Sequence, residues 1–518
     1  MDFGEEEKQE EEIHVLLVAF SAQGHLNPML RFGKRLATKG LQVTLATTEI
    51  ARERMLNSTN IATDTNSMKV DANTSICLEF FSDGHSLDYN RKTNLDDYMD
   101  SLGKFGPINL SNLIDKVSES KGGKFSCVVN NPFVPWVADV AQQHGIPCAM
   151  LWIQPCALYA IYYRFYNELN AFPTLTNPEM DVELPGFPLL KTEDLPSFVL
   201  PSNPFGSFPK LFAELFKNMG KLKWVLGNSV QGLEEEVIES MLNLYPIHPV
   251  GPLVPTMLLG NDQSNDIGVD MWKPDETCIE WLDTKPHSSV VYVSFGSITV
   301  LSAKQMENIA MGLKNSNCYF LWVVKPSEYK AEDDSGELPT GFLEEIRESQ
   351  RGLVVKWCSQ TNVLMHPSVG CFITHCGWNS TLEATSAGVP MIGFPQWTDQ
   401  PTNAKLINDV FKTGLRFKVD EHGMVSKEEV ERCISEIMDG PKSGDFKNRV
   451  AVLKEATRKA VSEGGSSELN IQGFIDEIKA FKQTELVKTP FNQVAHLQEK
   501  LGGLILQTSN ANGPETIT

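Results

Sequence analysis

The chain has 518 residues, of which 41% are hydrophobic and 21% are charged, and this length predicts two or more globular domains. Its 45 basic and 66 acidic side chains give a net charge of −21, which argues against nucleic acid or an anionic membrane as a partner. The 10 cysteines lack disulfide-framework spacing, no apolar run reaches transmembrane length, and the acidic start is unlike a signal peptide, so we expect a cytoplasmic protein.

The chain opens with a predicted strand–helix–strand unit, which follows a charged run of disordered composition at residues 1–12. We expect the three elements at Ile13–Phe20, Pro28–Gly40 and Leu41–Thr47. The residues SAQGHLNP lie between strand and helix, so His25 is expected on a loop at the carboxyl edge of a parallel sheet. A lone loop histidine is more often solvated than functional, and these residues alone leave both interpretations open.

The middle of the chain continues this alternation of strands and helices. The segment Cys127–Ala141, CVVNNPFVPWVADVA, predicts a strand and then a helix, and the strand AMLWI ends shortly before Gln154. The segment Pro185–Phe208 is too rich in proline to form one long helix. The prolines of Tyr245–Pro255 predict a stiff exit from the first domain.

The second half predicts another domain of the same class. The strand Ser289–Ser297 ends in a Gly296-Ser297 turn, which precedes a helix from Ser302. We place the first domain at 13–250, a linker at 251–275, the second domain at 276–465, a last helix at 466–482 and a tail at 483–518.

The most informative stretch runs from Trp357 to Gln400. Its strands are expected at Leu353–Trp357, Gly370–Thr374 and Met391–Pro395. The residues HCGWNS open a helix, in which Ser380 and Glu383 have capping-box spacing and Gly388 marks the end. A helix N-terminus at the carboxyl end of a parallel strand suits a diphosphate. Because neither GxGxxG nor GxxxxGK[ST] occurs there, a dinucleotide fingerprint and a P-loop are both disfavoured.

These 44 residues resemble, nearly position for position, the signature of plant UDP-sugar-dependent glycosyltransferases. The resemblance extends from about Ile13 to Phe481. It implies a GT-B fold, an α/β architecture of two Rossmann-like, doubly wound parallel-sheet domains that face a cleft. It also implies inverting transfer of glucose from UDP-glucose to a small lipophilic acceptor, such as a phenolic acid or flavonoid, without a metal ion or other cofactor.

The resemblance further implies a role for each signature residue. Trp357 would stack on uracil, Gln360 would contact the nucleoside, and Glu383 would bind the ribose hydroxyls. The remaining donor-site residues implied are Ser297, His375, Gly377, Asn379 and Ser380 at the diphosphate, and Trp378, Asp399 and Gln400 at the sugar. Taken singly, Trp357 also fits a core aromatic, and Ser380 with Glu383 also fits a plain helix cap.

The first domain would supply the base and the acceptor pocket. In the family a histidine in the position of His25 is the general base, and an imidazole with a pKa of about 6.5 suits that role for a phenol. Candidate acceptor-pocket residues are His85 in the loop Phe80–Asp88, Gln154, the helix that follows it, and the segment Pro185–Phe208, although packing of that segment on the core is an equally open interpretation.

One position departs from the family pattern. Many relatives support the histidine with an aspartate, and the aligned residue here is Asn131. An amide orients the ring but cannot offset an imidazolium charge, so His25 is expected to be a weaker base, and Asp139 lies too far along the helix to substitute. A carboxylic acid with a pKa of about 4 is already ionised at neutral pH and needs no strong base. The NNPF variant and the long tail resemble the branch that forms glucose esters of phenolic acids and limonoid glucosides.

Other interpretations remain. Against the ester-forming branch, His85 stands where we would expect a tryptophan, so C-glucosylation of an acidic polyphenol is an alternative. A non-catalytic UDP-sugar-binding module is a lower one. A zinc site is disfavoured because no CxxC pair occurs among Cys358, His366, Cys371, His375 and Cys376, and no DxD motif suggests a metal-bridged diphosphate. We expect a monomer.

Overall fold

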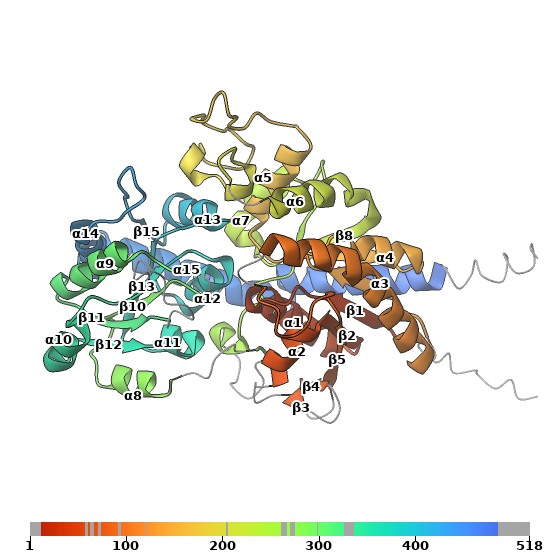
Figure 1. Ribbon diagram of the computed structural model, residues 1–518, viewed down its shortest axis with the longest axis horizontal. Helices are drawn as coiled ribbons and strands as arrows, with labels where there is room; N and C mark the ends of the chain where they lie inside the picture. The colour runs from red at the N-terminus through yellow and green to blue at the C-terminus, as the bar shows by residue number, and fades with distance from the viewer. Residues whose placement is uncertain are drawn as a thin grey trace, which may run out of the picture. The chain divides into compact units, whose positions relative to one another are not determined.

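The computed structural model describes residues 12–56, 61–62, 67–70, 74–91, 95–121, 123–203, 206–260, 267–269, 275–297, 299–325 and 336–484. The chain divides into two compact units, Met1–Asn470, which contains two Rossmann-like parallel sheets, and Ile471–Thr518 (Figure 1). The predicted architecture of two doubly wound sheets is confirmed. The predicted domain boundaries stay predictions, and the charged run 1–11 and the tail beyond 484 lie outside the described residues.

The first sheet has nine strands in the order β3-β4-β5-β2-β1-β6-β7-β8-β9. All its pairs are parallel except β3·β4 and β4·β5. Its strands are β1 His14–Val18, β2 Gln42–Thr48, β3 Ile61–Ala62, β4 Ser67–Lys69, β5 Ser75–Phe81, β6 Cys127–Asn130, β7 Cys148–Trp152, β8 Leu222–Gly227 and β9 His248–Pro249. The helices are α1 Gln23–Ala37, α2 Glu49–Leu56, α3 Leu95–Lys121, α4 Val137–Gln143, α5 Cys156–Tyr166, α6 Ser207–Lys217 and α7 Gln231–Ser240. Short 3₁₀ turns are η1 Thr192–Asp194, η2 Ser197–Val199 and η3 Met219–Lys221.

The second sheet has six parallel strands in the order β12-β11-β10-β13-β14-β15, of which β10 to β13 are seen in green in Figure 1. Its strands are β10 Val290–Ser294, β11 Tyr319–Val323, β12 Gly352–Val355, β13 Val369–Thr374, β14 Met391–Gly393 and β15 Gly414–Arg416. The helical elements are η4 Thr256–Leu259, α8 Thr277–Asp283, α9 Ala303–Asn315, α10 Phe342–Ser349, α11 Gln360–Met365, α12 Trp378–Ala387, α13 Gln400–Lys405, the π-helix η6 Leu406–Val410, α14 Lys427–Met438 and α15 Ser443–Val461. A further helix covers 466–484, and its predicted return to the first domain stays a prediction.

The central strands of both sheets are formed by the continuous apolar runs of the sequence. Every residue of β1, β6, β7, β10 and β13 is buried, as expected for parallel strands covered by helices on both faces. The proline-rich segment Pro185–Phe208 forms only the short turns η1 and η2 before α6 begins at Ser207, so the expectation of no long helix there is confirmed. Among the described helices, none combines the length and the apolar character needed to span a bilayer.

Two sequence-based boundaries were wrong. Helix α1 begins at Gln23 and contains Pro28, so His25 lies in its first turn and not on a loop. Proline at this internal position removes only the bond to the Gly24 carbonyl, and that carbonyl has another donor, described below. Helix α12 begins at Trp378 with Gly377 as its N-cap, so Ser380 and Glu383 form no capping box. Its end at Gly388, with φ of 83°, is as predicted.

Candidate active site

His25 and Asn131 meet at the carboxyl edge of the first sheet. Strands β1 and β6 are paired neighbours, with Val18 opposite Asn130, so the residues that follow them lie side by side. His25 Nδ1 lies 3.0 Å from Asn131 Oδ1. The ring is also held in edge contact with Phe133, whose centroid is 4.4 Å away. The predicted contact between the His25 ring and the Asn131 amide is therefore present in the structure.

The backbone of Phe133 fixes the tautomer of His25. The Phe133 N–H donates a 3.1 Å hydrogen bond to Asn131 Oδ1, which identifies that atom as the amide oxygen. Because this oxygen accepts the bond from the ring, Nδ1 of His25 must carry the hydrogen, and Nε2 carries the lone pair. Burial lowers the pKa of His25 to about 4, and the bond to Asn131 opposes that shift. The ring is neutral at pH 7 and presents a basic nitrogen.

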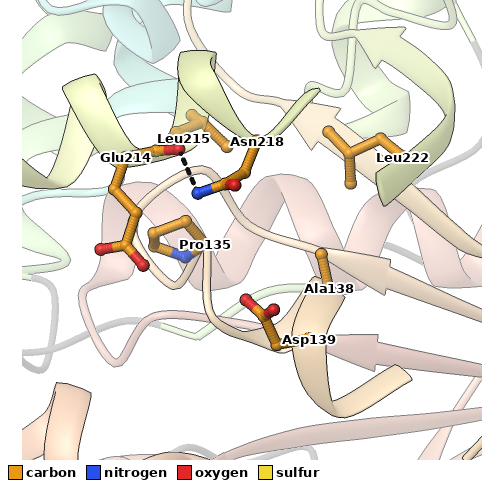
Figure 2. Close-up of a pocket in the computed structure, with 7 residues that line it drawn as sticks. All are labelled: Pro135, Ala138, Asp139, Glu214, Leu215, Asn218 and Leu222. Atoms are coloured by element: carbon orange, nitrogen blue, oxygen red, sulfur yellow. Dashed lines mark hydrogen bonds between the residues drawn. The ribbon is translucent and has the colours of Figure 1, made fainter. Parts of the chain in front are cut away.

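Asp139 does not replace the missing carboxylate. It lies in the first turn of α4, closer to the strand than predicted, but its side chain is 42% exposed and pairs with Lys221 at 2.7 Å. It lines a shallow surface pocket together with residues of α4, α6 and β8, namely Pro135, Ala138, Glu214, Leu215, Asn218 and Leu222 (Figure 2). This pocket contains neither His25 nor Asn131, so Asp139 faces away from the base.

Ser297 and His375 lie at the corresponding edge of the second sheet. Strands β10 and β13 pair with Ser294 opposite Thr374, which aligns the turns that follow them. Gly296 has φ of 77°, and a Cβ there would lie 2.7 Å from the His375 ring, so only glycine allows this approach. Burial lowers the pKa of His375 to about 4, so this ring is neutral as well.

Gln360, Ser380 and Glu383 form one hydrogen-bonded cluster. Gln360 Nε2 donates to Ser380 Oγ at 3.0 Å and to Glu383 Oε2 at 2.7 Å. Arg31 of α1 lies 3.9 Å from Glu383 Oε1. Because the N-cap of α12 is Gly377, three residues before Ser380, these side chains do not cap the helix and instead bond residues of α11 and α1. Gln360 and Glu383, both predicted to contact the nucleoside, thus meet here.

The first turn of α12 contacts the first domain. Trp378 is buried, and its Nε1 donates to the Asn228 carbonyl at 2.7 Å, so a sugar contact from this residue would use its backbone. Asn379 Nδ2 donates to the Gly24 carbonyl at 2.9 Å. At the N-cap, a Cβ on Gly377 would lie 2.5 Å from His375 Nε2, which explains the glycine. The residues predicted for the diphosphate therefore surround one helix N-terminus.

The carboxylate of Asp399 is buried and orders its own turn. It accepts hydrogen bonds of 2.7 Å from both Thr398 Oγ1 and Asn403 Nδ2. Burial raises its pKa, and bonds from Thr398, Asn403 and the side chain of Gln154 oppose the shift. Gln400 Oε1 accepts from the backbone N–H groups of Gln396 and Trp397, at 2.9 and 3.2 Å. The structure thus brings the side chain of Gln154 to Asp399, a residue predicted to bind the sugar.

Two further predicted residues have the following contacts. Trp357 follows β12, is half-buried, and accepts a 3.0 Å bond from the Asp275 N–H through its carbonyl. His85 stacks on Tyr89 with centroids 3.8 Å apart and lies 3.6 Å from Asp97. These contacts keep His85 within its own loop and the start of α3, and its place in an acceptor pocket stays a prediction.

Comparison with known proteins decides the family. The model described as UDP-glucoronosyl and UDP-glucosyl transferase matches residues 248–457. A gallate 1-beta-glucosyltransferase of Punica granatum is 45% identical over 469 residues, which cover 90% of this chain and 89% of the relative. A limonoid UDP-glucosyltransferase of Citrus unshiu is 42% identical over 509 residues, 96% of each chain. The chain belongs to the UDP-glucosyltransferase family.

Solved structures agree with this assignment. Os79 from O. sativa in complex with UDP matches this glucosyltransferase with a TM-score of 0.77 and 33% identity, over 90% of this chain and 100% of that one. A UDP-glucosyltransferase from Polygonum tinctorium, in complex with 3,4-dichloroaniline, matches with a TM-score of 0.74 and 27% identity, over 91% and 100%. The GT-B fold and the enzyme class predicted from the signature are confirmed.

Sequence reasoning missed several residues that shape this glucosyltransferase site. Asn403 bonds both Asp399 and, at 2.8 Å, the Cys376 carbonyl, and its spacing of four from Asp399 on a helix was a usable signal. Asn228 and Gly24 act through backbone carbonyls, which a sequence does not reveal. Within the described residues, no group of three or more His, Cys, Asp or Glu side chains is gathered as a metal ion would need. Metal independence of the transfer stays a prediction.

Proposed function

We propose that this enzyme transfers glucose from UDP-glucose to the carboxylate of a small aromatic acid and forms a glucose ester with inversion. The carboxylate oxygen attacks C1 of glucose, the bond from C1 to the diphosphate breaks, and its electron pair leaves with UDP. The observation that carries the proposal is the pairing of His25 with an amide, Asn131, at 3.0 Å. The gallate 1-beta-glucosyltransferase of Punica granatum acts on an aromatic acid, which supports the same class of acceptor.

Proton chemistry favours a carboxylic acceptor over a phenol. A phenol with a pKa of about 10 must lose its proton as it attacks, and the imidazolium that forms would lack a carboxylate partner. The pKa of His25, lowered to about 4 by burial, shows that its surroundings disfavour the charged ring. A carboxylic acid with a pKa of about 4 arrives ionised and requires only that His25 position it.

The donor residues take the roles implied by the signature. Trp357 stacks on uracil, Gln360 contacts the nucleoside, and the Glu383 carboxylate accepts hydrogen bonds from the ribose hydroxyls. The diphosphate lies at the α12 N-terminus, where Ser297, His375, Asn379 and the helix amides stabilise its charge. The glucose hydroxyls bond to Asp399, Gln400 and Gln154. Support for these assignments comes from the clustering of the side chains at one edge of the second sheet, together with the first turn of α1.

C-glucosylation is the second candidate, but the relatives reported above do not favour it. Incubation with UDP-glucose and a panel of phenolic acids, flavonoids and acidic polyphenols separates the products by stability. An ester is cleaved by alkali, a phenolic glucoside mostly survives alkali but is cleaved by acid, and a C-glucoside survives both. We expect an alkali-labile product. An alkali-stable product from every accepted compound would refute the proposed ester chemistry.

A further inference from the structure

The segment predicted to line the acceptor pocket is hydrogen-bonded directly to the turn that carries Asp399 and Gln400, the residues proposed to bind the sugar. The Ser197 N–H donates to the Thr398 carbonyl at 2.9 Å. In return the Thr398 N–H donates to Ser197 Oγ, also at 2.9 Å. This reciprocal pair joins η2 in the proline-rich segment to the turn Trp397–Gln400, two parts of the chain that lie 201 positions apart in sequence.

The turn needs such support because Thr398 adopts an unfavourable backbone conformation. Its φ is 57°, in the left-handed region, where a β-branched residue is strained. The conformation persists only if the surrounding structure holds it. It also aims Thr398 Oγ1 at Asp399 Oδ1, 2.7 Å away. Ser197 therefore stabilises the backbone that sets the direction of the Asp399 carboxylate.

A second set of contacts holds the same segment at Asp194, three residues before Ser197. Asp194 is buried, with 3% of its surface exposed, and its carboxylate pairs with Arg416 at 2.8 Å and Lys405 at 3.2 Å. Its carbonyl accepts a 2.8 Å bond from Thr402 Oγ1. Thr402 and Lys405 belong to α13, which follows Asp399 directly, and Arg416 belongs to strand β15 of the second sheet. The segment 194–197, which ends at the first residue of η2, is thus held at both of its ends to elements that flank that carboxylate.

We propose that Ser197 is a positioning residue for recognition of the donor sugar: it holds the Thr398 turn so that Asp399 and Gln400 face the hexose hydroxyls. The inference rests on the proposed function, since it requires Asp399 to bind glucose. It follows that the segment expected to contact the acceptor also sets the selectivity for the donor hexose. Substitution of Ser197, which bonds the Thr398 turn, then changes which UDP-sugar is used, whereas exposed positions of the segment do not.

The test compares Ser197→Ala with Ser202→Ala, a matched change at an exposed position five residues along the same segment. Kd for UDP, KM and kcat for UDP-glucose, and the ratio of kcat/KM for UDP-glucose over UDP-galactose are measured. We expect Ser197→Ala to leave Kd for UDP unchanged, because UDP lacks the hexose, and to lower kcat/KM for UDP-glucose about tenfold, the loss expected for one hydrogen bond in a buried turn. The preference over UDP-galactose should shrink by a similar factor.

Further outcomes are also informative. Ser197→Thr keeps the hydroxyl and should restore the preference. Equal kinetics and sugar preference for Ser197→Ala, Ser202→Ala and the wild type would overturn the inference, and a weakened Kd for UDP would show a general structural role and overturn it too. If Ser197→Ala does not fold, Ser197→Cys keeps the side-chain volume with a weaker acceptor and serves the same comparison. Absence of transfer by the wild-type enzyme would instead count against the proposed function.

Discussion

The side-chain amide of Asn379 donates a 2.9 Å hydrogen bond to the carbonyl oxygen of Gly24. This carbonyl would normally accept from the N–H four residues later in α1, but that residue is Pro28, which has no N–H. The proline therefore leaves an acceptor for a donor that lies 355 positions away in sequence. The bond joins the first turn of α1, which carries His25, to the first turn of α12, where the diphosphate is proposed to lie. An amide has two N–H groups, so Asn379 retains one for a phosphate oxygen.

Replacement of Pro28 by alanine should stabilise the protein but slow the reaction. Alanine restores a backbone N–H that can donate to the Gly24 carbonyl within α1. The free energy of unfolding should therefore rise by up to about 3 kcal/mol. Loss of the bond from Asn379, worth about 1 kcal/mol, should lower kcat about fivefold. Thermal unfolding and steady-state kinetics measure the two effects.

Helix α3 supplies a matched control, because it contains Pro107 four residues after Gly103, at the same spacing as Pro28 after Gly24. A Cβ on Gly103 would meet nothing within 4 Å, which shows that no other element packs closely against this side of α3. Pro107→Ala should raise stability with no change in kcat. If both variants leave kcat unchanged, the bond between Asn379 and Gly24 does not position the base.

His25→Ala should separate the two acceptor classes. With a phenolic acceptor the variant loses a general base, and kcat should fall by about 10²–10⁴-fold. With a carboxylic acceptor, which is ionised above a pKa of about 4, the loss should stay within about tenfold. The measurement is initial rate at saturating UDP-glucose for one acceptor of each kind. Equal losses would contradict the argument from acceptor pKa.

Asn131→Asp should convert the site toward phenolic acceptors. A carboxylate beside the ring favours the imidazolium and raises the pKa of His25 from its present value of about 4. Because His25 must be unprotonated to accept a proton, the acid limb of the phenolic pH–rate profile should move upward in pH. The rate at neutral pH should rise with phenols and change little with carboxylic acids. A profile that stays in place would show that residue 131 does not set the basicity of His25.

Ser380→Ala distinguishes a ligand role from a capping role. Loss of a helix cap costs about 1 kcal/mol of unfolding free energy, but the N-cap of α12 is Gly377 and Ser380 bonds Gln360 instead. Because Ser380 is buried, the variant should lose about 1 kcal/mol with the hydrogen bond from Gln360, so stability alone does not separate the two roles and the Kd for UDP decides between them. Its Kd for UDP, measured by calorimetry, should rise severalfold because Gln360 loses one of its two hydrogen-bond partners, Ser380 and Glu383. If the variant loses about 1 kcal/mol of unfolding free energy and its Kd for UDP is unchanged, Ser380 acts as a helix cap and not as a support for ligand binding.

The sequence by itself determined the elements and the family. Strands such as Val369–Thr374 are continuous apolar runs, and Gly388 ends α12 as its residue type demands, so local patterns sufficed there. The signature from Trp357 to Gln400 identified the enzyme class because many specific positions matched together. The resemblance to the family also predicted Asn131 as the partner of His25, and the structure brings the two together because they follow the paired strands β1 and β6.

Only the tertiary structure decided which partner each polar group has. The rule that proline marks a helix start failed at Pro28 because Asn379 replaces the lost hydrogen bond. The capping pattern failed at Ser380 because α12 begins earlier, with Gly377 as its N-cap, and Ser380 Oγ accepts a hydrogen bond from Gln360 instead. Ser197 and Thr398 carry no local signal of their pairing. A hydrogen bond depends on distances of about 3 Å between groups that packing brings together, and no periodicity within either segment encodes that approach. The fold therefore sets the orientation of the site, while the sequence sets its chemistry.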